Sequence, residues 1–147
     1  MFTIYNLLIF IHLLGLALGL GSSTVKLLLI LRCHSNYDFF YIYFKVSKLI
    51  TKLIVMGIIL MTLSGIAFLI MGYPFKMLLI VKLILVGMIW VLGPIIDNVV
   101  EPKLEKLMPV QGQAFSPAFS KIHKQHLALE ITATLLMYLI TIIGVLL

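Results

Sequence analysis

Four long apolar runs dominate the sequence and restrict what the chain can fold into. Each exceeds the roughly 20 residues that a helix needs to cross the hydrocarbon core of a bilayer. The runs extend over Ile4 to Leu31, Leu49 to Met71, Phe75 to Val100 and Leu127 to Leu147. Hydrophobic residues fill 63% of the 147 positions, more than a soluble domain of this length can bury. The sequence therefore predicts an all-α integral membrane protein, a single domain (1–147) folded as an antiparallel bundle of four transmembrane helices.

Three connections separate the runs and hold nearly all the charges. We expect the first, Arg32 to Lys48, to be an amphipathic segment on the membrane surface, because its aromatic residues are typical of an interfacial belt. The second, Gly72 to Pro74, predicts a tight turn in which Pro74 starts the third helix. The third, Glu101 to Gln125, is a long loop in which prolines keep any helix short.

The distribution of basic residues predicts how the bundle is oriented. Those near the long connections are Arg32, Lys45, Lys48, Lys52, Lys103, Lys106, Lys121 and Lys124, whereas the other side has Lys76. By the positive-inside rule, both long connections are cytoplasmic and both termini face outward, in what we take to be a prokaryotic plasma membrane. The net charge of +6 is thus a topology signal, and we expect no nucleic acid partner.

Two ionisable residues lie inside the predicted spans at matching depth. His12 and Lys82 each fall roughly 10 to 12 Å below the outer surface of the hydrocarbon core, at 1.5 Å of rise per residue. Ionisable groups at this depth are costly and are functional candidates, although a hydrogen-bonded histidine and a snorkelling lysine are the structural alternatives. The same layer collects the polar residues Thr62, Ser64, Tyr138 and Thr141. We expect a polar site here, with Lys82 and Tyr138 as candidate catalytic residues.

Small residues follow His12 along one face of the first helix. Gly15 and Gly19 share that face, and two interpretations stay open. The face packs closely against another helix through its small residues. Alternatively, it leaves space for a flat macrocycle whose iron His12 ligates, with Gly15, Gly19 and Lys82 in contact with the cofactor.

A second group of polar residues lies toward the opposite surface. Lys26 falls at the depth of Asp97 and Glu130, and we expect an ion pair with one of them, with a proton pathway or a propionate site as the alternative. His123 and His126 are spaced i, i+3, and we expect them on a solvated interfacial face rather than at a metal. His12 and His126 are near opposite surfaces and should not sandwich one haem.

Short motifs along the chain resemble the membrane proteins grouped around the copper-resistance protein CopD and the HemJ-type protoporphyrinogen oxidase. They are IHLLGLALGLGSS (11–23), LMTLSGIAFLI (60–70), LLIVKLILVGMIWVLG (78–93), EPKL (101–104) and LALEITATLLMYL (127–139). The resemblance implies a role for His12 and Lys82 at haem b, since a first-helix histidine and a third-helix lysine carry it in HemJ-type enzymes. The Trp-Met-Ala-Gly and Tyr-Leu-Pro-Arg elements of that enzyme are missing.

Three functional hypotheses follow. The first is a haem b protein acting in redox or tetrapyrrole chemistry, an oxidoreductase with His12 as the metal ligand. The second, implied by the CopD branch, is a copper or cation transporter using His12, Met61 and Met71. The third is a small accessory subunit that packs in a homo-oligomer or a larger membrane complex.

Overall fold

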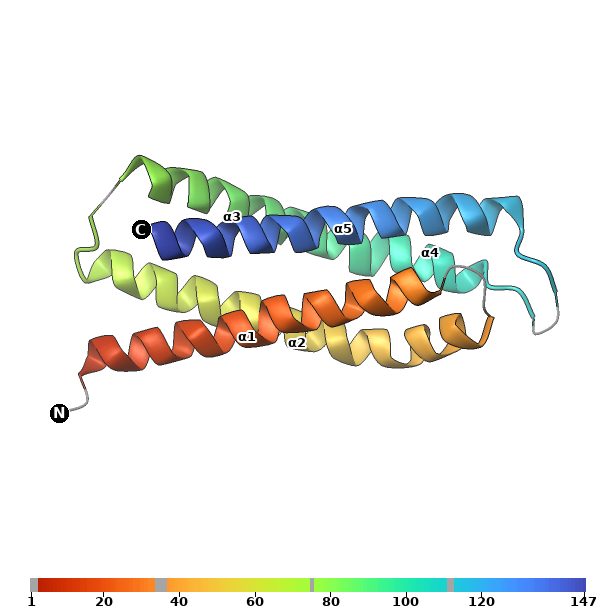
Figure 1. Ribbon diagram of the computed structural model, residues 1–147, viewed down its shortest axis with the longest axis horizontal. Helices are drawn as coiled ribbons and strands as arrows, with labels where there is room; N and C mark the ends of the chain where they lie inside the picture. The colour runs from red at the N-terminus through yellow and green to blue at the C-terminus, as the bar shows by residue number, and fades with distance from the viewer. Residues whose placement is uncertain (1–2, 34–36, 75, 111–112) are drawn as a thin grey trace.

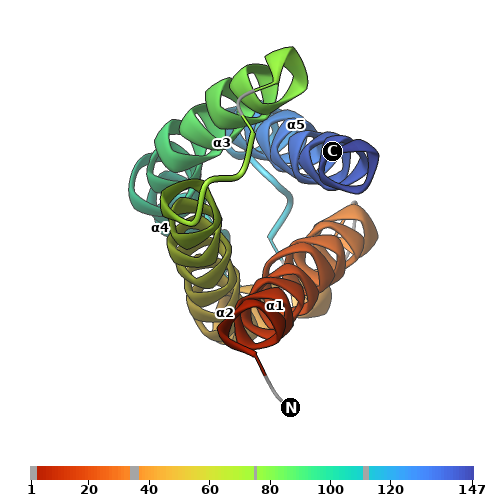
Figure 2. The same cartoon turned by 90° about the vertical axis from the view of Figure 1, so that its left-hand side faces the viewer.

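Four helical segments form the bundle that the apolar runs predict. The computed structural model describes residues 3–33, 37–74, 76–110 and 113–147. Its elements are α1 (Ile4–Arg32), α2 (Tyr37–Ile70), α3 (Met77–Ile95), the π-helical turn η1 (Ile96–Val100), α4 (Glu101–Lys106) and α5 (Pro117–Leu146). Since α3, η1 and α4 follow one another directly, they make one segment, and all four segments are long and apolar enough to span a membrane. Figure 1 shows them side by side with both termini at one end, and Figure 2 looks along the bundle from that end.

Capping residues set several of the helix ends. The side chain of Thr3 accepts a hydrogen bond from the amide of Asn6 at the start of α1, and Ser116 accepts one from Phe119 at the start of α5. The end of α2 is a Schellman motif, in which Gly72 has φ +88° and the amide of Tyr73 donates to the carbonyl of Phe68. Only glycine adopts this left-handed conformation without strain.

Two helices begin earlier than the sequence predicts. α2 begins at Tyr37 rather than Leu49, so residues 37–48 of the expected surface segment are the first part of a long helix that is apolar enough to span a membrane. α5 begins at Pro117 rather than Leu127, because proline is tolerated in the first turn of a helix and does not end one there. The expected role of Pro74 is also wrong, since α3 begins at Met77 after the N-cap residue Lys76.

An aromatic core closes the end of the bundle opposite the termini. The buried residues there are Ile30, Cys33, Phe40, Tyr43, Phe44, Leu104 and Phe119, contributed by α1, α2, α4 and α5 together with Cys33 just after α1. Phe40 packs edge-on against Phe119 with ring centroids 5.0 Å apart. The aromatic residues expected to form an interfacial belt are therefore partly core residues, while Phe39 and Tyr41 remain exposed.

Glycines bring α1 and α2 into backbone contact. A methyl group added at Gly57 would overlap the backbone of Gly19 and the carbonyl oxygen of Gly15, and one added at Gly15 would lie 2.9 Å from the carbonyl oxygen of Gly57. Such close approach is the way small residues allow transmembrane helices to pack. The interpretation of this face as a helix-packing surface is confirmed.

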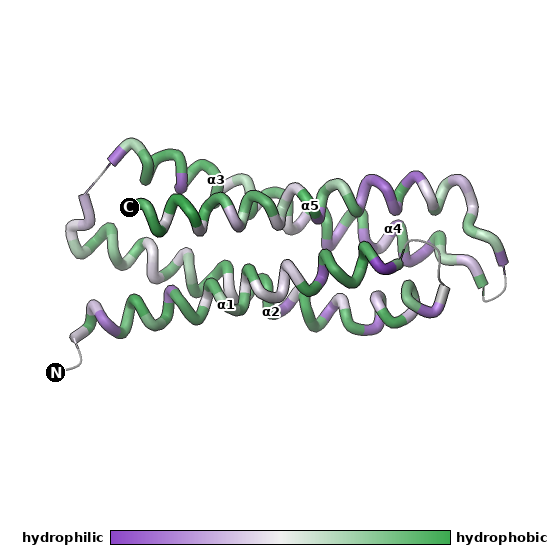
Figure 3. The backbone as a smooth tube through the Cα atoms, viewed as in Figure 1, coloured by the Kyte–Doolittle hydropathy of each residue, from purple (hydrophilic) through white to green (hydrophobic). Residues whose placement is uncertain are grey.

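The outer surface of the bundle is apolar over most of its length, with large exposed side chains such as Leu13, Leu63 and Val91. Figure 3 shows the hydrophilic residues concentrated toward the end opposite the termini. This surface suits contact with the hydrocarbon core of a bilayer, as an integral membrane protein requires.

Candidate functional site

The terminal half of the bundle encloses a cavity of about 250 Å³ between α1, α2, α3 and α5. Most of its wall is apolar, and the polar side chains on it are those of His12, Lys82, Thr62 and Thr141. Residues from four different helices thus meet at one level, as their matching depths predict. A mostly apolar concave space with a few convergent polar groups is the usual form of a small-molecule site.

Ser64 fixes the orientation and the tautomer of His12. The Oγ atom of Ser64 lies 2.6 Å from the carbonyl oxygen of Leu60 and 2.8 Å from Nδ1 of His12. A carbonyl only accepts, so the single hydroxyl proton is donated to Leu60 and the oxygen accepts from His12. This network assigns the hydrogen to Nδ1 and leaves the lone pair on Nε2. A histidine held in this way through one nitrogen is prepared to ligate a metal through the other.

The amine of Lys82 lies in the cavity without a counter-charge. In the described ranges, no hydrogen bond or ion pair reaches this residue, and the space that a Cβ of Gly144 would occupy is 2.9 Å from its Nζ atom. The side chain is half-buried. An ammonium group in an apolar cavity favours an anionic partner, because burial without one is costly.

Two glycines predicted at the cofactor lie elsewhere. Gly15 and Gly19 are buried against α2 and do not line the cavity, so the expectation that their face leaves room for a macrocycle is wrong. The glycines on the cavity wall are instead Gly65 of α2 and Gly144 of α5.

Tyr138 is also absent from the cavity wall. Its hydroxyl lies 3.1 Å from Oγ1 of Thr24, and its side chain is exposed on the surface of the bundle. The cavity face of α5 carries Met137, Thr141 and Gly144, and Tyr138 is rotated about 100° from that line. Depth along the helix axis placed Tyr138 at the right level but on the wrong face.

Lys26 is the centre of a buried charge cluster in the other half of the bundle. Its Nζ atom lies 2.8 Å from Asp97, 2.9 Å from Glu130 and 3.0 Å from Glu101, and it donates a hydrogen bond to Thr51. The predicted ion pair with Asp97 or Glu130 is confirmed, and both carboxylates take part. The π-helical turn that supplies Asp97 follows Pro94, which has no amide hydrogen for the helical ladder.

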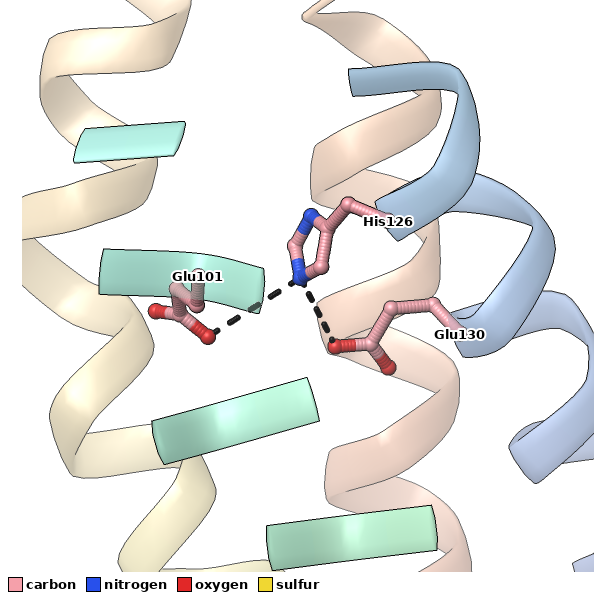
Figure 4. Close-up of side chains that lie close together, drawn as sticks. All are labelled: Glu101, His126 and Glu130. Atoms are coloured by element: carbon pink, nitrogen blue, oxygen red, sulfur yellow. Dashed lines mark ion pairs between the residues drawn. The ribbon is translucent and has the colours of Figure 1, made fainter. Parts of the chain in front are cut away.

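His126 extends this cluster. Its Nε2 atom lies 3.5 Å from Oε1 of Glu130 and 4.0 Å from Oε2 of Glu101, and the three side chains converge in Figure 4. His126 is fully buried and His123 is nearly so, so the expectation of a solvated face is wrong. The i, i+4 spacing of His126 and Glu130 was the sequence signal for this contact.

The chain matches no protein family, no curated protein sequence and no solved structure. The two polar sites are therefore the features of the molecule that bear on its function.

Proposed function

We propose that the protein binds haem b in the terminal half of the bundle and acts in redox or tetrapyrrole chemistry, as the resemblance to HemJ-type proteins implies. The supporting observation is that His12 lies on an apolar cavity with its Nδ1 atom bonded to Ser64. The unprotonated Nε2 atom is the donor that haem iron takes from histidine. The contact with Ser64 alone would suit a structural histidine as well, and it is the adjoining apolar cavity that favours a bound ligand.

The residues on the cavity wall fit such a cofactor in their chemistry. His12 would bind the iron, and the ammonium of Lys82 would hold a propionate carboxylate. Gly65 leaves open space on the wall that a larger residue would fill. The cavity of about 250 Å³ is smaller than most whole-ligand pockets, so it would hold only part of a macrocycle. When bound, haem supplies one-electron chemistry, and these residues bind it, orient it and exclude water.

The visible spectrum of the protein, expressed with haem available and purified in mild detergent, tests this proposal. We expect a Soret band in the wild type and its loss in His12→Ala. His123→Ala is the matched control, because His123 is another largely buried histidine, at the opposite end of the bundle. A colourless wild-type protein, or an unchanged band in His12→Ala, would overturn the proposal.

Copper transport is a second candidate, because thioethers line the same cavity as His12. Met61 and Met137 are both on its wall, and their terminal methyl groups each lie 3.1 Å from the position of a Cβ at Gly19. An imidazole with thioethers is a soft donor set that suits Cu(I). Met71, which the sequence suggested, is exposed beyond the end of α2 and is replaced in this role by Met137. Copper uptake by vesicles that contain the protein, without a Soret band, would favour this function.

We also propose that both termini face the outside of a prokaryotic plasma membrane. The supporting observation is that basic residues such as Arg32, Lys103 and Lys121 lie at the end opposite the termini, where Figure 3 shows the hydrophilic residues of the described chain. The haem site would then lie in the outer half of the membrane. Alkaline phosphatase fused to the C-terminus should be active in a bacterial host. A fluorescent protein that folds only in the cytoplasm should be dark when it is fused at the same position. The reverse result would show that the termini face the cytoplasm.

A further inference from the structure

We propose that Glu101, His126 and Glu130 form a binding site for a divalent metal ion, separate from the His12 cavity. Oε2 of Glu101, Nε2 of His126 and Oε1 of Glu130 all lie within 4.8 Å of one another. Ligand atoms about 2.1 Å from a tetrahedral ion lie about 3.4 Å apart. The pair from His126 to Glu130 has this separation already, at 3.5 Å, and small rotations of the side chains bring in the third atom.

With His126 neutral, as a metal ligand must be, the cluster has two more negative than positive charges. Three carboxylates, from Asp97, Glu101 and Glu130, surround the single ammonium of Lys26. The glutamate side chains are only 8% and 4% exposed, and excess charge is expensive to keep at such positions. One divalent cation brings the net charge of the cluster to zero.

Hydrogen bonding leaves Oε2 of Glu101 and Oε1 of Glu130 available as metal ligands. Lys26 has three N–H donors, and Thr51 and Asp97 each accept one, which leaves a single donor for two glutamates. Although both glutamate oxygens are within ion-pair distance of Lys26, neither accepts a well-formed hydrogen bond from the described part of the chain. These are the two oxygens that face Nε2 of His126 in Figure 4. The two oxygens nearest to Nε2 of His126 are therefore the ones that pair with Lys26, and a metal ion would share them with that ammonium.

The donor set defines the class of ion. Two carboxylate oxygens and one imidazole nitrogen suit Zn²⁺, Mn²⁺ or Fe²⁺, whereas Cu(I) prefers the thioethers of the other cavity. The hydroxyl of the fully buried Tyr43 lies 3.5 Å from Nε2 of His126, so a metal ion on this nitrogen would replace that contact. Burial by the aromatic core keeps competing water away from this half of the bundle.

Metal analysis of the purified full-length protein tests the site. The protein carries a tag without histidine, is equilibrated with Zn²⁺ or Mn²⁺ in mild detergent, and is analysed by mass spectrometry and competition titration. We expect stoichiometric metal in the wild type and in the matched control His123→Gln. In His126→Gln we expect at least about 100-fold weaker binding, because even loss of an outer-shell partner weakens metal sites by about 10- to 100-fold.

The outcomes that overturn the site are distinct from those for haem. Sub-stoichiometric metal in the folded wild type, or wild-type affinity in His126→Gln, removes the proposal, while the Soret band of the same samples reports on the His12 cavity alone. Size-exclusion profiles and the fluorescence of Trp90 show which variants fold, and Glu130→Gln is the second variant. If neither variant folds, spin-echo spectroscopy of Mn²⁺ in the wild type decides, since absence of an imidazole nitrogen coupling overturns the site.

Discussion

Replacing Lys26 by methionine measures how strongly the buried charge cluster depends on its one cation. Lys26 is 1% exposed and lies within 3.0 Å of three carboxylates. Methionine has a similar length, so the change removes the charge with little loss of packing. Asp97, at 22% exposure, can be solvated in part, so the cost falls on Glu101 and Glu130. Breaking a buried ion pair by removing one partner costs about 3 to 5 kcal/mol, and we expect a loss of that size in the free energy of unfolding.

Unfolding by sodium dodecyl sulfate in mixed micelles, followed by the fluorescence of the single Trp90, is the assay. The matched control is Lys48→Met, which removes the same group from an ion pair with Glu105 at 3.8 Å, where the lysine side chain is 75% exposed. An exposed pair of this kind contributes about 0 to 1 kcal/mol. We therefore expect the two variants, identical in chemistry, to differ by roughly 3 kcal/mol.

Equal stabilities of the two variants would refute the reasoning, because they would mean that the carboxylates around Lys26 are not charged or not desolvated. The double variant Lys26→Met with Glu130→Gln gives a further check. It removes one of the carboxylates that the single change leaves uncompensated. We expect it to be more stable than Lys26→Met alone, which is the coupling that a double-mutant cycle reports.

Three further predictions follow from the packing and hydrogen bonds. Gly57→Ala forces α1 and α2 apart and should lower the free energy of unfolding by about 1 to 3 kcal/mol. Gly21→Ala is the control and should not lower it, because the space around Gly21 is open. Equal free energies of unfolding for the two variants would contradict the close contact of α1 with α2. Burial raises the pKa of Cys33 to about 12 from 9.0. At pH 8 the thiolate fraction of Cys33 should therefore be about 1000-fold lower in the folded protein than in the denatured protein, and alkylation of the folded protein should be correspondingly slower. Ser64→Ala removes the acceptor of the His12 hydrogen bond and should weaken haem binding by about 10- to 100-fold in a spectroscopic titration; unchanged affinity would show that Ser64 does not hold the ligand.

The fold was predictable because hydropathy and charge act over whole segments. Four apolar runs determine the four-helix bundle, and each run contains enough residues to tolerate errors at its ends. The predicted start of α5 is wrong because Pro117 was interpreted as a helix breaker, although it occupies the first turn of the helix. The sequence-based prediction begins α5 at Leu127, ten residues too late, and so places His126 outside the helix. His126 is for this reason expected in water rather than beside Glu130.

The site was predictable along the helix axes but not around them. Rise per residue correctly brought His12 and Lys82 to one level, and Lys26 to the level of Asp97. Rotation about each axis depends on which neighbour a face packs against, and one sequence does not contain that information. Tyr138 and Gly15 were placed wrongly for this reason, since each lies at the expected depth on a face turned from the cavity.

Apolar side chains lie between the two polar sites. A smaller space beside Lys26 and Glu130 shares the side chains of Ile58, Ile89 and Met137 with the wall of the His12 cavity. A narrow passage between such side chains excludes water and ions unless one of them moves. Methionine is unbranched and changes rotamer more readily than a β-branched isoleucine. Of the three side chains that the two spaces share, Met137 is therefore the one that can change rotamer with the least disturbance to packing.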